Sequence, residues 1–112
     1  MFNFIKRLRP PKEDSVDFRR AMAARVNNKL IRYVSERDEH DEDIVVGRNG
    51  SLNVNRNGEL LVSSEGKVIF RVDVDTMTAG ELMSLDGVIL EGFDKESGRN
   101  RKIIAYYVYY RK

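Results

Sequence analysis

The sequence predicts a single α+β domain in which one long N-terminal helix packs on a mostly antiparallel sheet of about six short strands, with a short helix between strands four and five. Three observations predict this class: an apolar stripe with helical spacing near the N-terminus, strand-like alternation after residue 43, and tight-turn sequences between the alternating segments. The 112 residues suit one domain, and 41% of them are hydrophobic, enough for one core. A small β-barrel with a helical cap is the alternative, because these patterns do not separate an open sheet from a closed one.

The first element is expected to be a helix over residues 15–35. A double proline ends any earlier element, since proline cannot continue a helix, and Asp14 or Ser15 can cap the new one. The apolar stripe repeats every three or four positions and comprises Phe18, Met22, Val26, Leu30, Tyr33 and Val34. Residues 1–14 are therefore assigned to a basic N-terminal tail and residues 15–112 to the folded domain.

An acidic segment and four strands are expected next. Residues 38–43 hold five acidic side chains in six positions, which is typical of a solvated linker. The strands of an antiparallel meander are predicted at 44–47, 51–55, 59–64 and 67–74. The turns between them are predicted at two Asn-Gly pairs, which accept the positive φ angles of tight turns, and at one Glu-Gly pair: 49–50, 57–58 and 65–66.

The rest of the chain predicts a short helix and a final hairpin. The sequence Thr-Ala-Gly-Glu that begins at Thr78 matches a capping box, which favours a helix over about 78–85 that stops at Gly87. Alternating segments at 88–93 and 101–110 are interpreted as two strands joined by a polar loop.

Charge and composition narrow the function classes. The net charge of +2 is unevenly distributed: residues 1–37 carry ten basic and four acidic side chains, and residues 38–112 carry ten basic and fourteen acidic ones. Without cysteine the chain has neither disulfides nor thiolate metal sites. Because it also lacks a long apolar run and the pattern of a secretory signal, we expect a cytoplasmic protein.

No catalytic residue, cofactor or metal site is predicted, and we expect that the protein is not an enzyme. His40 is the only histidine and lies in the acidic segment, which argues against a nucleophile–base triad. That segment lacks the glycine and the ligand spacing of a calcium loop, and no phosphate-binding glycine motif occurs. An acid–base enzyme that uses Asp73, Asp75 or an acid near Asp94 is the third hypothesis, although carboxylates before a turn are typical turn formers.

The first hypothesis is a non-catalytic protein-interaction or structural module whose partner is another protein or a second copy of the chain. Exposed tyrosine and arginine are enriched at interfaces, and a tyrosine-rich terminal strand at a sheet edge can accept a partner strand. The candidate interaction surface comprises Arg19, Arg20, Arg25, Lys29, Arg32, Tyr106, Tyr107, Tyr109 and Tyr110. The alternative is electrostatic binding of nucleic acid or an anionic membrane surface through the basic N-terminal third.

Overall fold

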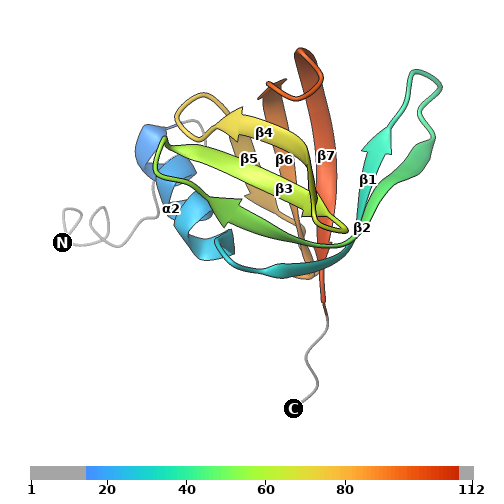
Figure 1. Ribbon diagram of the computed structural model, residues 1–112, viewed down its shortest axis with the longest axis horizontal. Helices are drawn as coiled ribbons and strands as arrows, with labels where there is room; N and C mark the ends of the chain where they lie inside the picture. Colours follow the sequence, from blue (N-terminus) through green and yellow to red (C-terminus); the bar gives the residue numbers. More distant parts are fainter. Residues whose placement is uncertain (1–14, 109–112) are drawn as a thin grey trace, which may run out of the picture.

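The computed structural model describes residues 15–108, which form one seven-stranded sheet and one helix (Figure 1). The elements follow one another as α2 (Val16–Val26), β1 (Leu30–Arg37), β2 (Asp43–Val54), β3 (Glu59–Ser64), β4 (Lys67–Asp73), β5 (Thr78–Glu81), β6 (Gly87–Asp94) and β7 (Arg99–Tyr107). The predicted α+β class is confirmed in outline, but the sheet has seven strands rather than six and the helix is short. The predicted tail at residues 1–14 lies outside the described residues.

The sheet is antiparallel throughout and curls into a half-barrel. Its strand order is β4-β3-β2-β1-β7-β6-β5, and every neighbouring pair is antiparallel. The curl brings β4 close to the end of β6, although these strands are not neighbours in the sheet. There the backbone N–H of Lys95 donates to the carbonyl of Arg71 at 2.8 Å. The fold therefore lies between the predicted open sheet and the alternative barrel.

The core lies on the concave face of the curled sheet, and α2 packs on it. The helix contacts β2 and β5 and buries Met22, Ala23 and Val26. Ser15 caps it by accepting a hydrogen bond from the N–H of Phe18 at 3.0 Å. The largest fully buried side chains come from the sheet and its connections: Phe70, Ile31, Leu52, Leu60, Met77, Leu90 and Ile103. Burial of this apolar surface is the main stabilising contribution to the fold.

The prediction of one helix over residues 15–35 is wrong beyond Val26. Asn28 adopts a φ of 70°, in the left-handed region that asparagine tolerates, and this ends the helix. The following segment is strand β1, whose β-branched and aromatic residues suit a sheet. Pairing with β2 and β7 on both sides outweighs the helical spacing of its apolar residues, and Leu30 of the predicted stripe is half exposed.

The predicted turn at Asn49-Gly50 is also wrong, because both residues lie inside the continuous strand β2. Gly50 is required there for a different reason: a Cβ atom on it would lie 1.6 Å from the carbonyl oxygen of Ser63 in β3. The positive φ that the pair predicts does occur, at Asn49 (51°). The turns predicted at 57–58 and 65–66 are confirmed, and they join β2 to β3 and β3 to β4.

Two further segments differ from their predictions. The capping-box sequence at Thr78 forms strand β5, paired with β6, so the predicted short helix is absent from the described residues. The acidic segment is the turn between β1 and β2, not a linker between helix and sheet. There the side chain of Asp38 accepts hydrogen bonds from the N–H groups of His40 and Glu42, both at 2.9 Å. The final hairpin is confirmed as β6 and β7.

Candidate functional site

The basic side chains of α2 pair with acids of the same domain. Arg20 makes two hydrogen bonds to the carboxylate of Asp75, at 2.9 and 2.8 Å, and Arg25 lies 3.0 Å from Glu81. The hydrogen bond from Arg20 lowers the pKa of Asp75. Arg19 donates to the carbonyl of Asp75 at 3.1 Å. The cationic face of the helix is thus directed at the connection from β4 to β5 and at β5 itself.

The other two basic candidates contact the end of β7. The Lys29 ammonium lies 5.0 Å from the centre of the Tyr107 ring, and Arg32 donates to the carbonyl of Tyr107 at 2.7 Å. Carboxylates therefore offset the charges of Arg20, Arg25 and Arg32, the last of which lies 3.8 Å from Asp86. Arg19 and Lys29 contact a carbonyl and an aromatic ring, which leave their positive charges in place. Electrostatic binding through the basic N-terminal third stays a prediction, and its basic residues at 6–12 lie outside the described part of the chain.

The two tyrosines at the end of β7, Tyr106 and Tyr107, point to opposite faces of the sheet, as strand alternation requires. Tyr106 lies on the outer, convex face and stacks on Tyr33 with 4.5 Å between ring centres. Tyr107 points to the concave face and is 8% exposed. The expectation that this strand is a sheet edge is wrong, because β7 lies between β1 and β6. Tyr109 and Tyr110 lie outside the described residues.

The buried hydroxyl of Tyr107 predicts a loss of stability in alkaline solution. Burial, followed by the nearby charge of Glu81, raises its pKa to about 12, and the hydroxyl has no hydrogen-bond partner. Because an unfolded tyrosine titrates near pH 10, the domain should lose about 2 kcal/mol of unfolding free energy between about pH 10 and pH 12 through this group.

Urea denaturation at several pH values tests this prediction, with Tyr107→Phe as the matched control. The variant lacks the titrating group, so its unfolding free energy should fall less steeply above pH 10. At neutral pH it should be at least as stable as the wild type, since a buried hydroxyl without a partner costs about 1 kcal/mol or more. Identical pH profiles for the two proteins would contradict the assignment.

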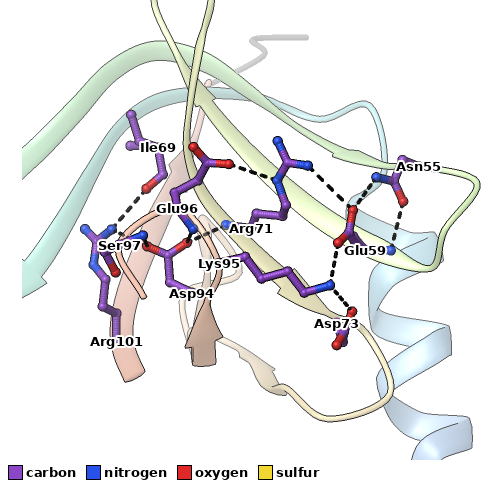
Figure 2. Close-up of polar contacts among 10 residues, drawn as sticks. All are labelled: Asn55, Glu59, Ile69, Arg71, Asp73, Asp94, Lys95, Glu96, Ser97 and Arg101. Atoms are coloured by element: carbon purple, nitrogen blue, oxygen red, sulfur yellow. Dashed lines mark hydrogen bonds and ion pairs between the residues drawn. The ribbon is translucent and has the colours of Figure 1, made fainter. Parts of the chain in front are cut away.

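A charged cluster lies on the concave face at the ends of β1, β6 and β7 and covers the edge of β4 (Figure 2). Arg101 binds both oxygens of Glu36, at 2.7 and 3.0 Å, one oxygen of Asp94 at 2.9 Å and the carbonyl of Ile69 at 3.0 Å. Asp94 is fully buried and also accepts the backbone N–H of Arg71 at 2.8 Å. The backbone N–H of Arg71 and the carbonyl of Ile69 lie on the edge of β4 that has no neighbouring strand in the sheet, and these contacts occupy both of them.

Hydrogen bonds keep the buried carboxylate of Asp94 ionised. Burial is the largest influence and favours the neutral acid, but donors at Arg71, Ser97, Glu96 and Arg101 together outweigh it and lower its pKa. The carboxylate is thus surrounded by donors from its own domain, which is the environment of a structural group rather than of a catalytic acid.

The neighbouring carboxylates of Glu59 and Asp73 also form ion pairs within the domain. Lys95 lies 2.6 Å from Glu59 and 2.8 Å from Asp73, and the hydrogen bond from Lys95 lowers the pKa of Glu59. Asp73 and Asp75 have different basic partners, so they do not converge on one point. The hypothesis of an acid–base enzyme therefore gains no support from these residues. Among residues 15–108 no cluster of three potential metal ligands occurs.

The end of the β1–β2 hairpin forms an arm, which we define as residues 36–45. β1 pairs with β7 only as far as Glu36, and β2 pairs with β3 only from Gly50 onward. Figure 1 shows this hairpin end standing away from the other strands. Ile44 and Val45 are each 46% exposed on it. The arm therefore presents apolar side chains on β2, and along the arm the edge of β2 that faces away from β1 has no neighbouring strand.

The outer face of the sheet continues the apolar surface of the arm. Beside the stacked tyrosines, Ile89 and Ile104 are only partly buried. A shallow hollow of about 210 Å³ lies between the arm and this face, lined by Ser35, Arg37, Asp43, Ile89, Lys102 and Ile104. Sequence reasoning missed this surface, since it placed the segment from residue 44 in an ordinary meander strand. The run of three β-branched residues from Ile44 was the available signal, because alternation cannot direct all three toward the core.

The chain matches no protein-family model, and neither a curated protein nor a solved structure is significantly similar to it. Within the part of the chain that the structure describes, no helix is long and apolar enough to cross a bilayer.

Proposed function

We propose that the protein is a non-catalytic interaction module that binds a protein partner through the arm and the adjoining outer face of β1 and β7. The observation that carries the proposal is the exposure of Ile44 and Val45 on a strand edge without a neighbour. An exposed apolar strand edge is a template for pairing with another chain, and natural proteins usually cover or charge such edges.

The contrast with the two outer strands of the sheet supports this proposal. The edge of β4 is occupied by Asp94, Lys95 and Arg101. β5, at the other edge, is four residues long and lies against α2. The domain thus hydrogen-bonds the backbone at the edge of β4 and keeps β5 short, whereas the edge of the arm has no neighbouring strand. Aromatic side chains beside the arm add contact area of the kind enriched at interfaces.

A photo-activated cross-linking residue placed at position 45 tests the proposal in cells that express the full chain. The matched control is the same residue at Met83, which is completely exposed on the β5–β6 connection and remote from the arm in sequence. We expect a protein adduct of defined mass from position 45 and none from position 83. Equal cross-linking from both positions, or none from position 45, would contradict the proposal.

A further inference from the structure

We infer that the end of the domain formed by the β5–β6 turn and the start of β1 docks on an anionic membrane surface, into which Met83 and Leu85 insert. This inference goes beyond the proposed function, because it assigns a second surface whose partner is a lipid bilayer rather than a protein. It rests on a group of exposed apolar side chains, on the turn that carries two of them, and on the positive charge around them.

Three large apolar side chains are exposed to solvent at this end of the domain. Met83 is completely exposed, and Leu85 and Leu30 are 62% and 50% exposed. Leu30 and Leu85 come from different elements but line the same open hollow of about 480 Å³, which Lys29 and Val108 also line. Exposed apolar side chains that gather in one place mark a contact with a partner or with a membrane.

The β5–β6 turn holds its apolar side chains away from the core. Two backbone hydrogen bonds close it, from the N–H of Leu82 to the carbonyl of Gly87 at 3.0 Å and from the N–H of Leu85 to the carbonyl of Leu82 at 2.8 Å. Leu85 has a φ of 64°, in the left-handed region that a bulky residue adopts only at a cost in free energy. A turn that only joined two strands would be more stable with glycine at this position.

The ionic groups at this end carry a net positive charge, which is complementary to an anionic bilayer. Lys29 is exposed and makes no ion pair among residues 15–108. The two carboxylates of residues 81–86 both have arginine partners: Glu81 lies 3.0 Å from Arg25, and Asp86 lies 3.8 Å from Arg32. Peripheral membrane binding combines buried apolar area with electrostatic attraction to anionic lipids, and both contributions are available here.

The end of β7 lies at the same place. The N–H of Val108 donates to the carbonyl of Leu30 at 3.0 Å. The sequence then continues with two tyrosines and two cations, which lie outside the described residues: Tyr109, Tyr110, Arg111 and Lys112. Tyrosine is enriched at the membrane–water interface, and lysine and arginine bind acidic headgroups. The composition of this segment therefore suits the same partner.

Co-sedimentation of the full chain with lipid vesicles tests the inference. We expect binding to vesicles of phosphatidylcholine mixed with phosphatidylserine, and weaker binding to phosphatidylcholine alone or at high salt. The double variant Met83→Ser with Leu85→Ser should lower the partition coefficient about tenfold or more, because it removes the apolar area that inserts. The matched control is Ile44→Ser with Val45→Ser, which removes two exposed apolar side chains from the arm and should bind vesicles as the wild type does.

A fluorescent probe at position 83 gives a second readout of insertion. Because the chain has no cysteine, Met83→Cys provides a single attachment site for an environment-sensitive dye. Its emission should shift to shorter wavelength when anionic vesicles are added, whereas the same dye on Val45→Cys should keep the emission it has in water. Thermal unfolding of each variant checks that the fold is retained, which we expect because the replaced side chains are all at least 46% exposed.

Three outcomes would overturn the inference. The wild type could bind neither kind of vesicle, or the arm variant could lose as much binding as the variant of Met83 and Leu85. The chain could also bind anionic vesicles while the dye at position 83 stays in water, and the contact would then belong to the basic N-terminal third. None of these outcomes affects the proposed function, since a lipid contact at position 83 yields no protein adduct and leaves the cross-linking control valid.

Discussion

Replacing Gly50 by alanine is expected to destabilise the domain by about 3 kcal/mol or more. A Cβ atom at this position would lie 1.6 Å from the carbonyl oxygen and 2.6 Å from the carbonyl carbon of Ser63. Both are backbone atoms of β3, so no side-chain rotation relieves the overlap. The strands would have to separate where β2 first pairs with β3, at the pair formed by Gly50 and Ser64. The apolar contacts on the concave face below would loosen with them.

The free energy of unfolding in urea measures this effect, and Gly80→Ala is the matched control. Gly80 also lies in a strand, but a Cβ atom on it would have nothing within 4 Å. Its replacement should change stability by less than about 1 kcal/mol, in the stabilising direction where alanine suits the strand better. If the two variants were equally stable, the close approach of β2 and β3 would not be what requires glycine at position 50.

Replacing Arg101 by alanine is expected to cost about 3–5 kcal/mol, the usual range when one member of a buried ion pair is removed. Arg101 and its partner Glu36 have side chains only 10% and 12% exposed, and that of Asp94 is fully buried. Without the guanidinium, both carboxylates lose their closest cationic partner while they stay largely out of water. Packing around Phe70 would also loosen, because the guanidinium of Arg101 lies 5.8 Å from the centre of the Phe70 ring.

Two comparisons separate charge from packing in this prediction. Arg101→Met retains most of the apolar volume, so a loss almost as large as that of the alanine variant would assign the cost to the buried carboxylates. Arg20→Ala removes an exposed pair, with side chains 63% and 52% exposed, and should cost much less stability than Arg101→Ala because solvent screens such pairs. Equal losses for Arg20→Ala and Arg101→Ala would contradict the structural role of the buried cluster.

Local sequence patterns were sufficient to predict the conformation of those segments whose conformation depends on their own residues. Glycine at position 58 and the pair Glu65-Gly66 do adopt positive φ angles, as their turns require. The alternation through Phe70 and Val72 directs these residues into the core. The final hairpin follows from two alternating segments around a polar loop. Each of these features is decided by interactions over a few residues.

The candidate site could not be predicted in the same way. The sequence indicated an interaction module but placed its surface on the basic helix and the tyrosine strand. Arg20 and Arg25 find their acidic partners more than fifty positions away, at Asp75 and Glu81. No pattern within the helix distinguishes an arginine that neutralises its own domain from one that faces a partner. The burial of Tyr107 likewise depends on which face of β7 the helix covers.

The sequence by itself determined the antiparallel class, the turns after β2 and β3, the terminal hairpin and the alternation that fills the core. The tertiary structure alone decided that the helix stops at Val26, that Gly50 lies inside a strand and that the segment at Thr78 is a strand. It also decided that the acidic turn sits on an arm with exposed Ile44 and Val45. The physical reason is the same throughout: turn residues and alternation act locally, whereas strand pairing, close backbone approach and charge neutralisation depend on neighbours that only the folded chain brings together.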